Sequence, residues 1–413
     1  MNELEVREKP SADPLPRLNR PKGSGSVHLD ALRGVAALMV LLYHWRLAFF
    51  QDYSKLAHHN FFLSLAYIVT GLGHQAVMVF FVLSGYLVGG SVLRAANAGQ
   101  WSWRDYLLTR LTRLYIVLLP ALVLGAALDW AGTHFTGQNT IYGPNGRAGS
   151  VMLTVNETLN PRAFVENAVF LQSFPLPDDR LHQFPTFGSN VPLWSLSYEF
   201  WYYIGFPFIV LALSRKTSWF AKLVYFVLLL AWSWFVGLTV LVYSIPWLLG
   251  VAIRTLPPFP SRRSWARRGA LTVALAMLIL GFVAGSLVNP WLQDIFIGEC
   301  TAALIWISVS GTAVPLVGWY GRMAHGAAKN SYTLYLLHLP FLVFLKAALH
   351  VPQFLPSWLT LLPALGILAL ILAYVRLVYL LFERHTDDLR IWLKQRLAGR
   401  QRVTTNAASH AAN

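Results

Sequence analysis

The chain has 413 residues, of which 56% are hydrophobic and only 12% are charged, and its mean hydropathy is +0.49. This balance is far from that of soluble domains and indicates a membrane protein. A net charge of +15 would suit a nucleic-acid partner only if the basic residues gathered on a water-exposed domain, but they fall in short runs between apolar segments. A nucleic-acid binder is therefore excluded, and the lipid bilayer is the expected surroundings.

Apolar runs need about 20 residues to cross a bilayer. The sequence contains ten such runs, or nine to eleven because several abut, and they predict an all-α, polytopic transmembrane helical bundle. Arginine and lysine are concentrated in every second connection, which predicts cytoplasmic N- and C-termini for a multi-pass protein of the plasma membrane. The predicted spans are 29-50, 68-92, 107-130, 192-213, 218-235, 237-254, 269-289, 293-311, 329-349 and 357-382.

The segments outside the spans differ in composition. Residues 1-26 are polar and proline-rich and lack the apolar core of a signal peptide, which predicts a disordered cytoplasmic tail. The transmembrane domain covers 27-383 and has one long outer connection, 131-191, that could act as a lid. Residues 384-413 are basic and predict a cytoplasmic helix and tail, anchored on the anionic membrane surface. The apolar positions of that helix are Leu389, Trp392, Leu393 and Leu397.

The first span carries two ionisable residues eleven positions apart, Arg33 and His44. At about 100° and 1.5 Å per residue they share nearly one face and lie roughly 16 Å apart along the helix axis. Ionisable side chains near mid-membrane usually face a bundle interior or a watery cavity. A neutral His44 could accept a proton from a hydroxyl, or it could only bond a neighbouring helix. Asp30 is one turn from Arg33, and the two are expected to pair at the cytoplasmic edge.

The second and third spans carry glycines and arginines, respectively. Gly85, Gly89 and Gly90 permit close helix approach. The motif R-L-T-R places Arg110 and Arg113 one helical turn apart at the inner end of the third span. Two guanidinium groups on one face can hold phosphates bidentately, although the same pair could serve only as a positive anchor at the membrane surface.

The fourth span opens with an acidic residue close to its apolar part. Ser195 and Glu199 are four residues apart and share a face, with Trp194 and Tyr198 beside them. A carboxylate at this depth needs a partner, and His44 on a neighbouring helix would be a suitable one. A carboxylate on the far ring nitrogen would fix the histidine tautomer and stabilise the imidazolium, so we predict a contact between Glu199 and His44.

The later spans contribute a polar stripe and a single thiol. Ser331, Tyr335 and His338 share one helical face, where they could line a substrate path or simply bond neighbouring helices. Cys300 is the only cysteine, which excludes an intramolecular disulfide and a cysteine-based metal site, and its apolar surroundings predict a buried structural thiol. The loop histidines show no metal-ligand spacing beyond one adjacent pair, so no metal site is expected.

Together these motifs resemble acyltransferase family 3, the integral-membrane acyltransferases that modify sugars and related acceptors, mostly in bacteria. The resemblance implies a ten-span fold that takes an acyl group, commonly acetyl, from acyl-CoA and passes it to an acceptor hydroxyl. It implies no bound cofactor, because acyl-CoA is a co-substrate. The stretches that carry it are LDALRGVAALMVLLYH, VMVFFVLSGYLVGG, RLTRLYIVLLP, VPLWSLSYEFWYY and SYTLYLLHLP.

The resemblance also assigns roles. His44 and Glu199 would be catalytic, and Arg33, Arg110 and Arg113 would bind acyl-CoA. Coenzyme A would enter from the cytoplasm, and His44 would deprotonate a hydroxyl of a cell-envelope carbohydrate or glycolipid that arrives from the outer side of the inner membrane. The residues expected to support this site are Asp30, Tyr43, Trp194, Ser195, Tyr198, Tyr335 and His338.

A different class of protein would explain several of the same features. A transporter or flippase for a lipid-linked sugar also needs about ten spans, intramembrane His and Glu, and basic inner loops. It has no use for a coenzyme A site, so binding of acetyl-CoA separates the two alternatives.

Overall fold

The computed structural model describes residues 24–136, 141–143, 147–148, 151–152, 155–175, 183–260, 263–283, 289–310 and 318–397. Most of these residues are helical, and the strands among them are two residues long, β1 (Arg147–Ala148) and β2 (Val151–Met152), paired antiparallel. The predicted all-α bundle is confirmed. The tail predicted over 1-26 lies outside the described residues up to residue 23, and so does the C-terminal tail after residue 397.

In the part of the chain that is described, nine helices are long and apolar enough to cross a membrane. Short helices connect them, namely α2 (Phe61–Val69), α6 (Val155–Thr158), α7 (Pro161–Ala168) and α12 (Trp319–Lys329). The long ones are α1 (Ser24–Phe49), the run of α3 (Gly73–Ser84), the π-helix η2 (Gly85–Gly89) and α4 (Gly90–Ala98), then α5 (Trp103–Phe135), α8 (Leu193–Leu213), α9 (Trp219–Ala252), α10 (Ser264–Val283), α11 (Pro290–Val309), α13 (Ser331–Ala348) and α14 (Trp358–Leu381).

Helix α9 contains two of the ten predicted spans, 218-235 and 237-254. Its backbone leaves the helical conformation at Gly237, where φ is 78° and ψ is 171°, a region that glycine enters at little cost. The ring contacts with α8 run antiparallel before Gly237 and parallel after it, so the chain reverses direction there. These contacts are Phe208–Tyr225 and Trp201–Phe235 before the break, and Tyr198–Tyr243 and Phe206–Trp247 after it.

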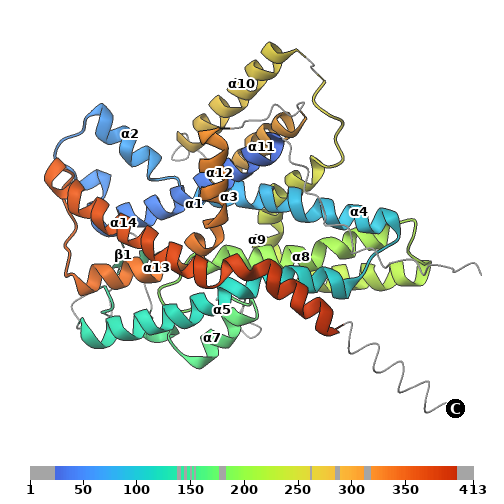
Figure 1. Ribbon diagram of the computed structural model, residues 1–413, viewed down its shortest axis with the longest axis horizontal. Helices are drawn as coiled ribbons and strands as arrows, with labels where there is room; N and C mark the ends of the chain where they lie inside the picture. Colours follow the sequence, from blue (N-terminus) through green and yellow to red (C-terminus); the bar gives the residue numbers. More distant parts are fainter. Residues whose placement is uncertain are drawn as a thin grey trace, which may run out of the picture.

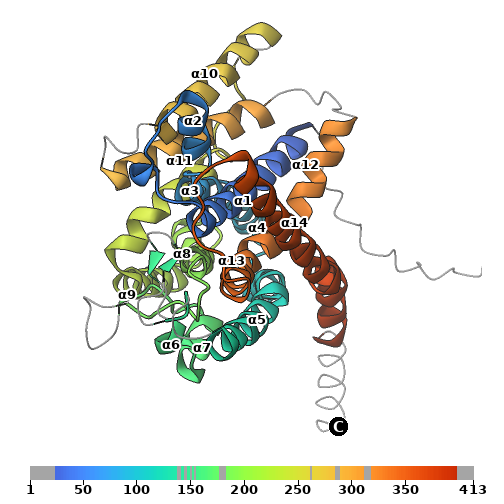
Figure 2. The same ribbon diagram turned by 90° about the vertical axis from the view of Figure 1, so that its left-hand side faces the viewer.

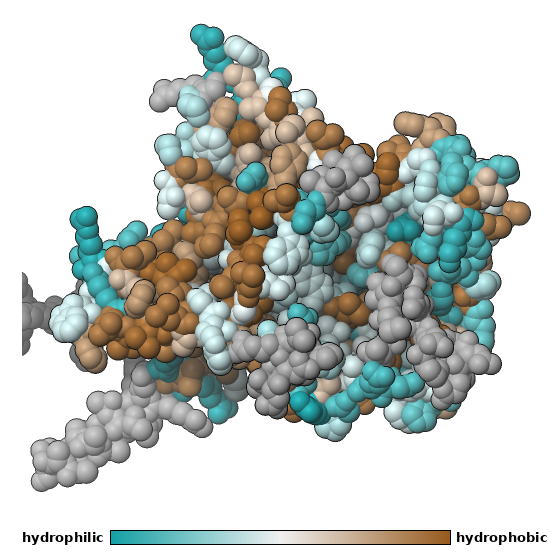
Figure 3. Space-filling view, turned by 180° about the vertical axis from the view of Figure 1, so that it is seen from behind, coloured by the Kyte–Doolittle hydropathy of each residue, from teal (hydrophilic) through white to brown (hydrophobic). Residues whose placement is uncertain are grey.

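The spans form a bundle around α13. Figure 1 shows α3, α5 and α8 running in roughly the same direction, and the end-on view in Figure 2 places α13 between α1, α5 and α14, all of which it contacts. Helix α10 extends away from this bundle and packs against α11. The face shown in Figure 3 carries a broad hydrophobic surface, as expected for side chains that face lipid.

The second span packs tightly against the second half of α9. A Cβ on Gly85 would lie 1.8 Å from the carbonyl oxygen of Trp247, and one on Gly250 would lie 2.0 Å from that of Val82. A Cβ on Gly89 or Gly90 would likewise lie 2.4 Å from Val251 or 2.5 Å from Arg254, so the close helix approach predicted for Gly85, Gly89 and Gly90 is confirmed. It brings Ser84 within 3.2 Å of the Trp247 indole nitrogen and of the Tyr203 hydroxyl on α8.

A buried carboxylate fastens the connection that leads into α8. Asp129, near the end of α5, accepts hydrogen bonds from the backbone and the hydroxyl of Ser189, both at 2.7 Å, and from the Tyr142 hydroxyl at 3.1 Å. The Asn190 side chain donates to the carbonyl oxygen of Leu336 on α13 at 2.8 Å. These bonds fix the start of α8 against α13, where the candidate site lies.

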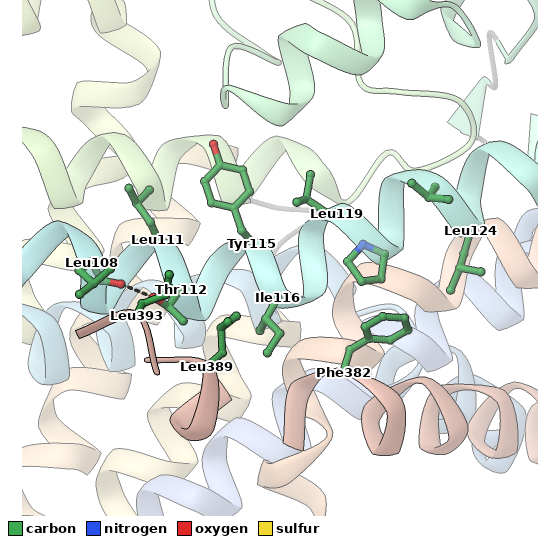
Figure 4. A pocket seen from close by; sticks show the side chains of 12 residues that line it. Leu108, Leu111, Thr112, Tyr115, Ile116, Leu119, Leu124, Phe382, Leu389 and Leu393 are labelled. Carbon is green, nitrogen blue, oxygen red and sulfur yellow. Dashed lines mark hydrogen bonds between the residues drawn. The ribbon is translucent and has the colours of Figure 1, made fainter. Parts of the chain in front are cut away.

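An apolar groove of about 650 Å³ runs along α5. Residues 386–397 are helical, and Figure 4 shows Leu389 and Leu393 of this helix pointing toward α5. None of the side chains that line the groove is acidic or basic, so the ionisable candidate residues lie elsewhere. Cys300 is buried as predicted, on α11.

Candidate active site

Two histidines from α1 and α13 meet inside the bundle. His44 Nδ1 and His338 Nε2 are 3.0 Å apart, and the ring centroids are separated by 5.0 Å. His338 is fully buried, whereas His44 is only half-buried. The sequence singled out both residues but did not predict that they pair.

Backbone carbonyls decide which nitrogen of each ring carries the proton. His338 Nδ1 lies 2.8 Å from the carbonyl oxygen of Leu334, which can only accept, so Nδ1 carries the hydrogen in the neutral ring. His338 Nε2 is then an acceptor for His44 Nδ1, which also lies 2.9 Å from the carbonyl oxygen of Val40. His44 Nε2 then keeps its lone pair, which is the state of a general base.

Glu199 does not hold His44. Its Oε1 accepts the hydrogen bond of the Tyr203 hydroxyl at 2.5 Å, one turn further along α8. The predicted contact between Glu199 and the far nitrogen of His44 is wrong, because Val40 and His338 occupy that nitrogen. Helix neighbours are set by packing over the whole chain, which the spacing of residues within one span does not report.

Ser195 and Tyr335 dock the start of α8 on α13. The Tyr335 hydroxyl donates to the carbonyl oxygen of Pro192 at 3.1 Å and lies 2.6 Å from Ser195 Oγ, which donates to it in turn. The Tyr335 ring lies 6.5 Å, centroid to centroid, from that of His338. The predicted polar stripe on α13 therefore bonds α8 through Tyr335 and His44 through His338.

Aromatic side chains pack around the start of α3 and the start of α8, next to the two histidines. Trp194 stacks on the ring of His74 at 5.6 Å with an interplanar angle of 17°, and it meets Tyr198 edge-on at 5.3 Å. Tyr43 packs on Gly73, where a Cβ would lie 2.5 Å from the Tyr43 Cβ. His74 was not singled out in the sequence, although it opens an apolar span and an ionisable ring there is a functional candidate by default.

Arg110 is partly engaged by its neighbours. Its Nη2 donates to Ser91 Oγ at 2.9 Å, and its guanidinium carbon lies 5.6 Å and 5.8 Å from the ring centroids of Tyr106 and Tyr203. Tyr203 also bonds the Glu199 carboxylate, so Tyr203 connects that carboxylate to the guanidinium of Arg110.

The other two arginines lie within electrostatic range of one carboxylate, which is itself bonded by Thr333. Arg33 and Arg113 both act electrostatically on Glu383, which follows α14. Arg113 itself is exposed. Asp30 lies on the same helix as Arg33, and its Oδ2 is 3.2 Å from Nδ1 of His325 on α12, a contact that the sequence did not predict. The structure thus brings the predicted acyl-CoA residues to one end of the bundle.

A family model described as an acyltransferase domain matches residues 27–378, which is most of the chain. The chain belongs to acyltransferase family 3. Since its long helices suit a bilayer, this member of acyltransferase family 3 is a multi-pass membrane acyltransferase. No curated protein and no solved structure gives a significant match. The family match favours acyl transfer over the transporter that the span pattern alone would also allow.

Proposed function

We propose that this membrane acyltransferase moves an acyl group from cytoplasmic acyl-CoA to a hydroxyl of a carbohydrate or glycolipid acceptor of the cell envelope. Acetyl is the acyl group that we expect. The observation that carries the proposal is that His44 Nδ1 contacts Val40 and His338, an arrangement that leaves the lone pair of the neutral ring on Nε2. A ring in this state takes a proton from a hydroxyl without first having to lose its own.

The donor would be held by its phosphates. Arg33, Arg110 and Arg113 offer guanidinium groups at one end of the bundle, and coenzyme A carries phosphates that such groups bind bidentately. Arg33 precedes His44 by eleven helical residues, or roughly 16 Å along the axis. The pantetheine arm has about the length to carry the thioester across that gap.

The transfer needs one general base and neither consumes nor releases a proton. His44 Nε2 takes the hydrogen of the acceptor hydroxyl while the oxygen attacks the carbonyl carbon of the thioester. The carbon–sulfur bond then breaks, the thiolate of coenzyme A takes the proton from His44, and the acyl group remains on the acceptor as an ester. His338 keeps the His44 ring in one tautomer and one orientation throughout.

Binding of the donor is the direct test of the arginine end. We expect purified protein in nanodiscs to bind acetyl-CoA, and the variants Arg110→Gln and Arg113→Gln to bind it with affinity reduced roughly tenfold or more, because each loses a charge-assisted contact with phosphate. S-acetylpantetheine, which carries the thioester without the coenzyme A phosphates, should bind the wild type and both variants equally weakly. Isothermal titration calorimetry measures both ligands.

Arg162→Gln is the matched control. Arg162 is an exposed arginine on α7, where its Nε donates to Glu166 at 2.7 Å, and its loss should leave acetyl-CoA binding unchanged. Equal affinity of the wild type and the two arginine variants for acetyl-CoA would show that the phosphates are not bound at this end. The donor half of the proposal would then fall.

A further inference from the structure

A second buried contact that involves a histidine joins His74 on α3 to Asp294 on α11. We call this contact and the one between His44 and His338 the two histidine pairs. His74 Nε2 is 2.9 Å from Asp294 Oδ2. The Asp294 side chain is only 3% exposed, whereas that of His74 is 42% exposed. Because a carboxylate only accepts, Nε2 carries a hydrogen and Nδ1 is the nitrogen that is free to meet a ligand.

The neighbours of this pair are aromatic or polar. Trp194 stacks on His74, and Tyr243 meets its ring at 6.2 Å and also interacts with Asp294. The Asp294 carboxylate interacts with both His74 and Tyr243, whereas Gln75 Oε1, on the residue that follows His74 in the chain, is buried and has no hydrogen-bond partner among the described residues. Buried polar atoms without partners are rare in folded proteins, and they indicate a place where ordered water or a ligand completes the bonding.

The pair borders the same region as His44. Gly73 packs directly on Tyr43. His74 follows Gly73 in the sequence and His44 follows Tyr43, so both histidines are next to the same contact between α3 and α1. From the other side, Trp194 stacks on His74 while the next residue, Ser195, bonds Tyr335 beside His338. The two histidine pairs therefore lie on neighbouring helices around the start of α8.

The pair is also remote from the arginines. Arg110 bonds Ser91, which follows His74 by 17 residues along the same run of helix. Such a separation corresponds to roughly 25 Å along a helix axis. A donor held at Arg110 would reach His44 from one end of the bundle, which leaves the His74 end for the acceptor.

We propose that His74, held by Asp294, is a positioning residue that binds a second hydroxyl of a polyhydroxylated acceptor while another hydroxyl of the same molecule reacts at His44. This inference rests on the proposed function. Trp194 and Tyr243 supply aromatic surface for the apolar face of a sugar ring, and the imidazole supplies the directional bond. A site built to bond a hydroxyl discriminates strongly against alcohols that lack one.

The test compares two acceptor probes that share an alkyl chain. Octyl β-D-glucoside presents several hydroxyls and 1-octanol presents one, and both are offered with radiolabelled acetyl-CoA to the full chain in nanodiscs. Thioester hydrolysis without acceptor reports the donor half of the reaction. We expect His74→Ala to raise the KM for octyl β-D-glucoside roughly tenfold or more, and to leave octanol acylation and hydrolysis unchanged. Asp294→Asn should shift the same KM in the same direction and add little to His74→Ala.

His134→Gln is the control. His134 is an exposed histidine near the end of α5 whose Nδ1 lies 2.8 Å from a carbonyl oxygen four residues back, and its loss should change none of the three readouts. An unchanged KM for octyl β-D-glucoside in His74→Ala would overturn the inference. So would a parallel loss of hydrolysis, because it would assign His74 to the donor chemistry or to folding.

The inference and the proposed function fail in different ways. Hydrolysis that requires His44, without any transfer to octyl β-D-glucoside by the wild type, would leave the donor chemistry standing and overturn the polyol site. Hydrolysis that persists in His44→Ala would overturn the proposed function, and the inference with it.

Discussion

Each of the two histidine pairs of the bundle contains a half-buried imidazole, but the two imidazoles have different partners. His44 meets a second imidazole, His338, whereas His74 meets the carboxylate of Asp294. A carboxylate stabilises the cationic form of a histidine and fixes its tautomer, while an imidazole fixes the tautomer without supplying a negative charge. The first arrangement suits a base that must return its proton to a leaving thiolate, and the second suits a ring that holds a ligand.

The two pairs also expose different nitrogens. The partners of His44 occupy Nδ1 and leave Nε2, the nitrogen farther from the backbone, whereas Asp294 occupies Nε2 of His74 and leaves Nδ1. The nitrogen left without a partner among the described residues is therefore the one at the tip of the side chain in His44 and the one next to Cγ in His74. The difference assigns chemistry to the first ring and placement to the second.

The largest expected effect is that of removing the first ring. His44→Ala should lower acyl transfer and acetyl-CoA hydrolysis together by about 10³-fold, within the range found for general bases, because no other group holds a lone pair at that position. Acetyl-CoA affinity should stay within a few-fold of wild type, since the phosphates bind at the arginine end. Steady-state rates and calorimetry on the same preparation measure both, and transfer above a tenth of the wild-type rate would refute the assignment.

The partner of His44 should matter less than His44 itself. His338→Phe removes the acceptor for His44 Nδ1, and we expect kcat to fall on the order of 10–100-fold, as for other residues that orient a functional histidine. Glutamine can place an amide oxygen near the position of Nε2, so His338→Gln should recover much of the loss. Both variants are read at saturating donor and acceptor, and a kcat of His338→Phe equal to wild type would show that the pairing has no part in the reaction.

The spans and the motif residues could be predicted from the sequence because each depends on a short stretch of chain. A span is a local apolar run, and even the reversal inside α9 coincides with the boundary predicted between 218-235 and 237-254. The spacing of Arg33 and His44 on one helix is likewise a local property. The fold class and the candidate residues on single helices follow from such local patterns.

The pairings between helices could not be predicted in this way. His44 and His338 are 294 residues apart, and His74 and Asp294 are 220 residues apart, so their contacts depend on which spans pack together. The predicted contact between Glu199 and His44 rests only on both residues being ionisable and lying inside spans. That criterion indicates how deep a residue lies in the membrane, but it does not indicate which helices pack together. The same rule, applied to every ionisable residue in a span, would have singled out Asp294.

Glu199 offers the finest test of the comparison, because it decides whether His44 works without a carboxylate. The Gln side chain keeps an oxygen that can accept the Tyr203 hydrogen bond, so Glu199→Gln should leave kcat within about threefold of wild type. A modest fall in the KM for acetyl-CoA is expected, since Tyr203 lies between Glu199 and Arg110 and the loss of a negative charge there strengthens the attraction of Arg110 for phosphate. If kcat instead fell a hundredfold while donor affinity held, the carboxylate would have to reach His44 during turnover. The first histidine pair would then resemble the second, and the division between a reacting ring and a positioning ring would be lost.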